Sequence, residues 1–262
     1  MRTPLKTHGG KHYLAAKILP LLPPHRVYVE PFAGGLSVLL RKPWAPVEVA
    51  GDLDQELINF YHVLCAQTTN LIDRAKPLAY SREVLAWAKE PGNPADRLDA
   101  ALRFLVRRRF SRGGLGRDFA WSTRLRGGQP GDQNAWETAK AELSRIAERL
   151  RGVQFVCQNA IQTIRQFDGP GTLTYLDPPY PASVRSAKKC YEHEMSLDQH
   201  AWLLHTTTRV QGAVAISSYA NPLYDRWLAT WDRHEFPMPN HAGQGCSKAR
   251  RVEVLWIKVA TV

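Results

Sequence analysis

The residues best suited to chemistry form the tetrapeptide Asp177-Pro178-Pro179-Tyr180, which follows the apolar run Leu173-Thr174-Tyr175-Leu176. If that run is a buried strand, the tetrapeptide sets a carboxylate and a backbone carbonyl at the strand's carboxyl end, where open α/β sheets bind ligands. The two prolines fix φ and add no N–H that would compete for these acceptors. Two fixed acceptors can hold one amino group by both of its protons.

An amino group on an aromatic ring is a poor nucleophile because its lone pair is delocalised into the ring. Hydrogen bonds from both protons, to Asp177 and to the carbonyl of Pro178, would favour a more pyramidal and more nucleophilic nitrogen. Tyr180 can stack on the ring so held. The pattern therefore predicts a methylation site for a planar amine, with Asp177, Pro178, Pro179 and Tyr180 as catalytic residues. The alternative is a strand and a proline-rich turn, with Asp177 capping a helix.

The elements that must position this site begin with a predicted strand over Val27–Glu30 and the glycine turn 31–35. The apolar residues 36–40 follow, and we expect them to form the helix that the turn opens. The next strand, 47–50, ends in Gly51-Asp52, and an acid at this place accepts hydrogen bonds from ribose hydroxyls in nucleotide-binding folds. The full G-x-G-x-x-G fingerprint is missing, so the pattern favours a nucleoside ligand such as S-adenosylmethionine over a dinucleotide.

Strands and helices alternate through the rest of the chain, except between residues 71 and 152, which look helical and basic. Alternation of this kind predicts an α/β fold with a parallel sheet. We expect a Rossmann-like, S-adenosylmethionine-dependent methyltransferase sheet formed by residues 1–70 and 152–262, and a mainly helical insert over 71–151. The remaining predicted elements are helices at 13–22, 53–64, 136–150, 161–167, 197–210 and 223–231, strands at 153–157, 173–176, 213–217 and 252–259, and a long loop at 181–195.

The composition indicates a globular protein with an acidic polymer as its partner. With 262 residues, of which 44% are hydrophobic, the chain can build a substantial core. Its net charge of +11 and its pI near 9.7 favour nucleic acid, because lysines and arginines displace counterions from phosphates. A basic surface would also suit solubility or a membrane surface, but the basic residues cluster at 103–126 and 248–251.

The sequence gives no sign of a metal centre, a disulfide framework or a membrane span. Its four cysteines are far apart, and none belongs to a Cys-x-x-Cys pair or stands near a histidine at zinc-binding spacing. The amino terminus lacks the apolar core of a signal peptide, and no later stretch is apolar for long enough to cross a bilayer. We therefore expect a protein of the reducing cytoplasm that needs no metal.

Arginines, glycines and aromatic residues are interleaved within the insert, most densely over 107–117. Arginine side chains on a glycine-rich loop suit contacts with phosphates and with base edges. A solvated charged face is the alternative. A second basic run follows near the carboxyl terminus. The residues that we expect to contact nucleic acid are Arg107, Arg109, Arg112, Arg117, Arg124, Lys248, Arg250 and Arg251.

The order of the motifs resembles that of the Dam-type DNA adenine-N6 methyltransferases of the alpha group: Gly9-Gly10-Lys11, Phe32-Ala33-Gly34-Gly35, Asp52, the basic insert and Asp-Pro-Pro-Tyr. The resemblance covers nearly the whole chain. It implies that the insert is a DNA target-recognition domain, and that Arg117 stands where some relatives have an arginine that binds guanine. It also implies an S-adenosylmethionine site formed by Gly10, Lys11, Glu30, Phe32, Ala33, Gly34, Gly35, Asp52, Asn159 and Asp177.

The resemblance implies a site-specific enzyme that flips one adenine out of double-stranded DNA and transfers a methyl group from S-adenosylmethionine to N6. One copy of the chain suffices for this chemistry, so we expect a monomer. The alternatives are methylation of another planar amine, namely cytosine N4, RNA adenine or a protein glutamine, and a DNA-binding relative without catalysis. Cytosine-N4 enzymes more often carry Ser before the prolines and glutamine enzymes usually carry Asn, whereas this chain carries Asp177.

Overall fold

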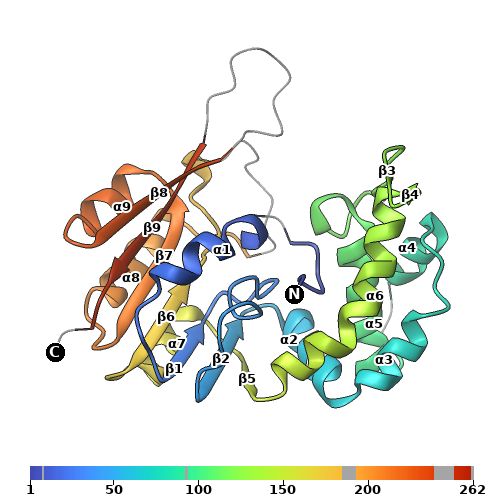
Figure 1. Ribbon diagram of the computed structural model, residues 1–262, viewed down its shortest axis with the longest axis horizontal. Helices are drawn as coiled ribbons and strands as arrows, with labels where there is room; N and C mark the ends of the chain where they lie inside the picture. The colour runs from blue at the N-terminus through green and yellow to red at the C-terminus, as the bar shows by residue number, and fades with distance from the viewer. Residues whose placement is uncertain (8, 92–93, 185–192, 239–250, 261–262) are drawn as a thin grey trace, which may run out of the picture. The chain divides into compact units, whose positions relative to one another are not determined.

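A seven-stranded, mostly parallel sheet organises the chain, as predicted (Figure 1). The structure is a computed structural model that describes residues 1–7, 9–91, 94–184, 193–238 and 251–260. The strands follow the order β5-β2-β1-β6-β7-β9-β8, in which β1, β2, β6 and β7 are parallel and β8 and β9 are antiparallel. Their bounds are Val27–Glu30 for β1, Val47–Asp52 for β2, Val153–Cys157 for β5, Thr172–Leu176 for β6, Ala213–Tyr219 for β7, Asp232–Met238 for β8 and Arg251–Lys258 for β9.

The register of the parallel strands brings their carboxyl ends to one edge of the sheet. Val29 of β1 is paired with Val49 of β2 and with Thr174 of β6, and Leu176 of β6 is paired with Ile216 of β7. Every residue of β6 is buried, including Thr172 and Thr174, so the strand is covered on both faces of the sheet. The residues that follow β1, β6 and β7 therefore lie at the edge where α/β sheets bind ligands.

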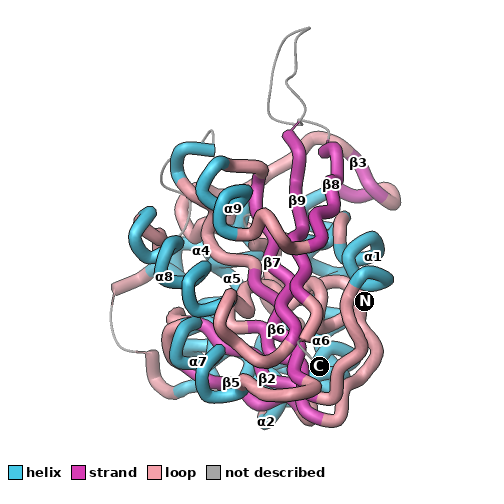
Figure 2. The backbone as a smooth tube through the Cα atoms, turned by 90° about the vertical axis from the view of Figure 1, so that its left-hand side faces the viewer, coloured by secondary structure: helices cyan, strands magenta, loops and turns pink. Residues whose placement is uncertain are grey.

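Three helices cover one face of the strands β6, β7 and β9, as Figure 2 shows. They are α7 (Ala160–Phe167), α8 (Leu197–Thr207) and α9 (Pro222–Trp227). Ser196 caps α8, because Ser196 and Gln199 form a reciprocal capping box. The core between these helices and the sheet consists of Ile164, Leu176, Leu203, Leu204, Val210, Val214, Ile216, Tyr224, Leu228, Val254 and Trp256.

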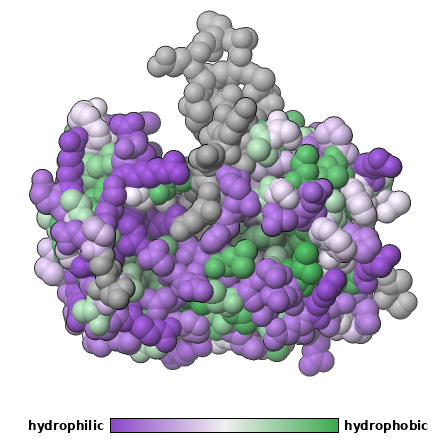
Figure 3. Space-filling view, turned by 180° about the vertical axis from the view of Figure 1, so that it is seen from behind, coloured by the Kyte–Doolittle hydropathy of each residue, from purple (hydrophilic) through white to green (hydrophobic). Residues whose placement is uncertain are grey.

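Among its described residues, the region that was predicted to be helical and basic contains four α-helices, the 3-10 turn η3 (Arg112–Gly114) and a short hairpin. The helix α2 (Gln55–Ala66) precedes them, and the bounds of the others are α3 (Thr68–Ala75), α4 (Arg82–Lys89), α5 (Arg97–Phe110) and α6 (Gly131–Leu150), with a hairpin of β3 (Leu125–Arg126) and β4 (Gln129–Pro130). Trp136 is buried among them, in edge contact with Phe110 at 5.1 Å, and its indole N–H donates to the carbonyl of Leu78. Hydrophilic residues predominate on the surface of these helices in Figure 3.

Contacts along the chain define two compact units. We call the first, Met1–Ala15, Ala33–Pro43 and Asp52–Cys157, the helical unit. We call the second, Ala16–Phe32, Trp44–Gly51 and Gln158–Val262, the sheet unit. The functional division into a catalytic domain and an insert over 71–151 stays a prediction. Among the described residues, no helix has the length and apolar character that crossing a membrane requires.

Two local predictions were wrong, and one strand was missed. Residues 36–40 form successive turns instead of a helix, because Leu36 adopts φ of 53° and the whole run is buried without a polar face. The predicted helix 13–22 is broken into α1 (Ala15–Ile18) flanked by the 3-10 turns η1 (Lys11–Tyr13) and η2 (Leu19–Leu21), since Pro20 has no N–H to continue the ladder. Strand β8 was missed because Asp232, Arg233 and Glu235 are charged and Pro237 is unusual inside a strand.

Candidate active site

Asp177 lies directly after the buried strand β6, and the neighbouring strand β7 orients its carboxylate. The side chain is half-buried, and its Oδ1 accepts a hydrogen bond of 3.1 Å from the hydroxyl of Ser217. The Ser217 oxygen is also 3.3 Å from the hydroxyl of Tyr175. Two strands therefore fix this acceptor at the sheet edge, and its predicted contact with an amino group stays a prediction.

Tyr180 is held more tightly than its sequence position suggested. Its side chain is only 4% exposed, its hydroxyl donates to the carboxylate of Glu253, and its ring meets Tyr219 edge-on at 4.9 Å. Burial, then the charges of Glu253 and Asp177, raise the pKa of the Tyr180 hydroxyl well above its usual range. Tyr180 is therefore a protonated donor, with its ring position set by β7 and β9.

Sequence reasoning missed Glu253, the buried partner of Tyr180. It lies in β9 directly opposite Tyr219 in the register. The available signal was a single acidic residue in the otherwise apolar strand sequence Val-Glu-Val-Leu-Trp-Ile. An unpaired carboxylate is costly to bury, so such a residue should have a fixed partner.

The other predicted site residues of the sheet unit have different surroundings. Glu30, the last residue of β1, is 3% exposed and accepts a hydrogen bond of 2.8 Å from the hydroxyl of Tyr28. Phe32 packs against the core between the sheet and its helices. Asn159 is exposed and caps α7, where its Oδ1 accepts from the backbone N–H of Gln162 at 2.9 Å.

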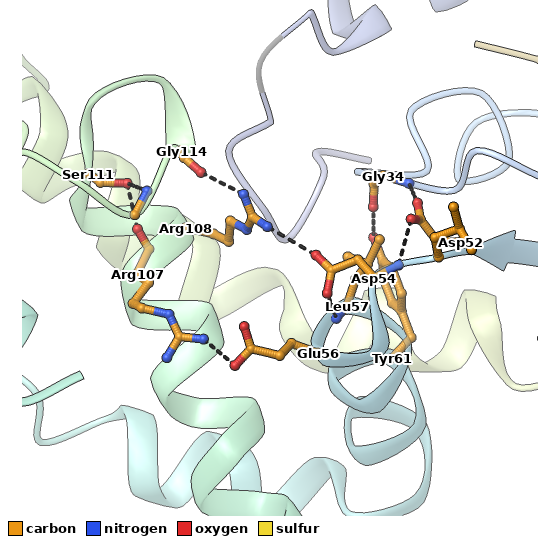
Figure 4. A network of polar contacts seen from close by, with 12 residues as sticks. Gly34, Asp52, Asp54, Glu56, Leu57, Tyr61, Arg107, Arg108, Ser111 and Gly114 are labelled. Carbon is orange, nitrogen blue, oxygen red and sulfur yellow. Dashed lines mark hydrogen bonds and ion pairs between the residues drawn. The ribbon is translucent and has the colours of Figure 1, made fainter. Parts of the chain in front are cut away.

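In the helical unit, Asp52 organises the glycine turn that was predicted to bind the cofactor (Figure 4). Its Oδ2 accepts from the backbone N–H of Gly34 at 3.1 Å, and its Oδ1 accepts from the N–H of Asp54 at 3.1 Å. The hydroxyl of Tyr61 donates to the carbonyl of Gly34 at 2.7 Å, and the Tyr61 ring stacks on Phe155 of β5. Gly34 has φ of 44°, and no atom lies within 4 Å of the place that a Cβ would take. The turn is therefore fixed but open to a ligand.

Two further glycines are needed because Thr7 packs against both. A Cβ at Gly10 would lie 2.7 Å from Oγ1 of Thr7, and a Cβ at Gly35 would lie 3.0 Å from the same atom. Lys11 follows in a 3-10 turn, is 4% exposed, and donates from Nζ to the carbonyl of Gly9 at 3.1 Å. The Gly-Gly-Lys motif and the glycine turn are thus brought together within the helical unit.

Two of the predicted nucleic-acid contacts line a basic groove of about 840 Å³ in the helical unit. Arg112 and Arg117 are exposed there, and within the described residues neither guanidinium has a hydrogen-bond or ion-pair partner. Trp121 is 62% exposed at the same groove. Arg82 and Lys89 of α4 add positive charge, whereas Glu90 and Asp118 are its acidic residues. Arg124 is exposed just before the β3–β4 hairpin.

Arg107 and Arg109 are used inside the helical unit. Arg107 pairs with Glu56 at 2.5 Å and donates to the carbonyl of Ala88, while Arg109 donates to the carbonyl of Ala135. Burial lowers the pKa of Arg109 to about 10. Their DNA contacts stay predictions. The hydrogen bonds that they form support a structural role within the helical unit. Lys248 and Arg250 lie outside the described residues, and Arg251 begins β9.

Comparison with known proteins shows the family of this chain. Residues 8–235 match the family model of the D12 class N6 adenine-specific DNA methyltransferases. A DNA adenine methylase of Salmonella typhimurium is 27% identical over 96% of this chain and 93% of the relative. One from Serratia marcescens is 28% identical over 94% and 90%, and one from Vibrio cholerae serotype O1 is 30% identical over 76% and 73%. The chain therefore belongs to the D12 class of N6 adenine-specific DNA methyltransferases.

Proposed function

We propose that Asp177 and the carbonyl of Pro178 accept the two N6 protons of an adenine that has been extruded from duplex DNA. The observation that carries this proposal is the Asp177 carboxylate itself, half-buried at the end of β6 and oriented by Ser217 at 3.1 Å. A preorganised acceptor of this kind stabilises the positive charge that develops on N6 as the new bond forms. Pro179 fixes the backbone that follows, and Tyr180 forms a wall of the site.

The methyl donor in this proposal is S-adenosylmethionine, which supplies an electrophilic methyl group on a sulfonium. The described residues fit a nucleoside of this kind. Asp52 offers carboxylate oxygens to ribose hydroxyls, and the open, positive-φ backbone at Gly34 lets a ligand approach closely. Gly10, Lys11, Ala33 and Gly35 complete the proposed site in the helical unit, and Glu30, Phe32 and Asn159 are the proposed contacts from the sheet unit.

Arg112, Arg117 and Arg124 are the proposed DNA contacts among the described residues. Their exposure, and the absence of internal partners for Arg112 and Arg117 within the described chain, support this role. Extruding a base costs a few kcal/mol, which phosphate and base contacts must offset. We further propose that one copy of the chain acts without a metal. A cytoplasmic location stays a prediction.

The proposal is tested by sequencing for N6-methyladenine at single-base resolution in DNA from cells that express the wild type or Asp177→Asn. We expect methylation in one sequence context, lost in the variant. With purified protein, transfer of labelled methyl groups should fall by about 10²–10³-fold, because the carboxylate acceptor is gone while the shape is kept. Binding of duplex DNA should change little.

Asp225→Asn is the matched control, since Asp225 is an aspartate of the sheet unit whose side chain is 42% exposed and forms an ion pair with Arg233. It should methylate like the wild type. If Asp177→Asn lost DNA binding, cofactor binding and thermal stability together, Asp177 would be structural. If wild-type protein left DNA unmarked but labelled RNA or protein, the substrate would be another planar amine.

A further inference from the structure

A chain of hydrogen bonds within the helical unit connects Asp52, the proposed cofactor contact, with the loop that carries Arg112 and Arg117, the proposed DNA contacts (Figure 4). It starts at Asp52, whose two oxygens hold Gly34 and the backbone N–H of Asp54. Asp54 is buried and caps α2, with Oδ1 accepting from the N–H of Leu57 at 3.0 Å. The second oxygen of Asp54 is then available to another donor.

Arg108 of α5 supplies that donor and extends the chain of contacts. Its Nη2 donates to Oδ2 of Asp54 at 3.0 Å, and its Nη1 donates to the carbonyl of Gly114 at 3.1 Å. One rigid guanidinium therefore spans the start of α2 and the glycine loop 111–117. An arginine suits this place because its planar fork can hold two acceptors in a fixed relation, which the point charge of a lysine does not.

The glycine loop has few ways to move independently of Arg108. Gly114 has φ of 73°, and a Cβ there would lie 1.8 Å from the carbonyl oxygen of Lys6, so the loop packs on the backbone of the amino-terminal segment. Ser111 donates to the carbonyl of Arg107 at 2.6 Å and accepts from the N–H of Gly116 at 2.7 Å. A shift of the start of α2 would thus be transmitted to the loop as a whole.

We propose that Arg108 is a positioning residue that couples occupancy of the Asp52 site to the placement of Arg112 and Arg117 on DNA. This inference rests on the proposed function of the two ends. A ligand that donates hydrogen bonds to Asp52 changes the strength of the hydrogen bond that the Asp52 carboxylate accepts from the N–H of Asp54. Through the Arg108 fork, the same change biases the loop on which both DNA-facing arginines stand. By linkage, DNA on the loop changes cofactor affinity by the same factor.

The test measures that factor directly. The affinity of a labelled duplex carrying the methylated sequence is measured with and without saturating S-adenosylhomocysteine, and the affinity of S-adenosylhomocysteine is measured with and without the duplex. We expect both ratios in the wild type to agree at about fivefold or more, the lower end of typical coupling. In Arg108→Gln both ratios should fall close to 1.

Arg103→Gln is the matched control on the same helix. Arg103 also donates to one carboxylate, Asp99 at 3.0 Å, and to one carbonyl, Trp87 at 2.8 Å, and its side chain is 21% exposed against 22% for Arg108. It touches neither Asp54 nor Gly114 by these bonds. The coupling ratio of Arg103→Gln should equal that of the wild type. Its thermal stability should fall to about the same extent as that of Arg108→Gln.

Asp54→Asn keeps one oxygen for the helix cap, but an NH2 donor replaces the oxygen that accepts from Arg108, so the hydrogen bond and the ion pair to Arg108 are lost. Its coupling should also fall, and the double variant Asp54→Asn/Arg108→Gln should lose no more than either single one. A ratio of 1 in the wild type, or a full ratio in Arg108→Gln, would overturn the inference. Failure of the proposed function gives a different result: the wild-type protein would bind no S-adenosylhomocysteine or would leave DNA unmethylated. The inference about Arg108 would then fail as well.

Discussion

The two units position their proposed site residues by different means. In the sheet unit, Asp177 and Glu30 stand at the ends of buried strands, and their acceptor atoms are oriented by side chains of the same sheet. In the helical unit, Asp52, Gly34 and Arg108 belong to a strand end, a turn and a helix, and mutual hydrogen bonds hold them. We infer that the first arrangement suits chemistry on a fixed geometry, and the second suits binding that must respond to ligands.

A kinetic comparison of Asp52→Asn with Asp177→Asn separates these two roles. Asp52→Asn should raise the KM for S-adenosylmethionine by about 10–100-fold, because charge-assisted hydrogen bonds contribute roughly 1.5–3 kcal/mol each. Its kcat should stay within a few-fold of the wild type at saturating cofactor, in contrast to Asp177→Asn. Initial rates over a range of cofactor concentrations give both constants. A variant that lost kcat with KM unchanged would assign Asp52 to the chemical step and remove the contrast.

Substitutions of Glu253 test how strongly the sheet unit depends on the hydrogen bond between Tyr180 and Glu253. Glu253→Ala leaves the buried hydroxyl of Tyr180 without its acceptor, and should lower the free energy of unfolding by about 1–3 kcal/mol. Glu253→Gln retains an acceptor and should lose less. Chemical denaturation with both variants measures the difference. Equal stability of the alanine and glutamine variants would mean that the hydroxyl finds another partner.

The sequence could predict features that leave a local pattern, but not contacts between distant residues. Strand β6 was predicted because a short, mostly apolar run is followed directly by two prolines, and Asp177 lies at its end as predicted, while the role of Asp177 stays a prediction. The helix over 36–40 was wrong because a run that is buried on all sides carries no helical period, and the positive φ of Leu36 is set by the surrounding turn. Contacts between distant positions leave no local pattern, so neither Tyr180 with Glu253 nor Asp54 with Arg108, 54 positions apart, could be found.

Salt dependence tests which arginines of the helical unit face DNA. Arg117→Gln should weaken DNA binding and reduce the slope of log affinity against log salt by about 0.9, if its guanidinium neutralises one phosphate. If it reads a guanine instead, the slope should hold while discrimination between sequences falls. Arg107→Gln should leave the slope unchanged and lower stability, because Arg107 already pairs with Glu56. If both substitutions lowered the slope equally, Arg107 would contact DNA as Arg117 does, and the distinction between the two arginines would be wrong.

The smallest expected effect concerns alkaline pH and Tyr180. Because burial and the charges of Glu253 and Asp177 raise its pKa, folded Tyr180 stays protonated where an unfolded tyrosine, with a pKa of about 10, ionises. Its contribution to stability is therefore fully present below about pH 10 and is lost as the pH rises toward the folded pKa, by up to about 1.4 kcal/mol per pH unit. Tyr180→Phe should flatten this decline in denaturation curves between about pH 9 and 11. An unchanged slope would mean that Tyr180 ionises as readily in the folded sheet as in the unfolded chain, and its wall position would then be open to solvent.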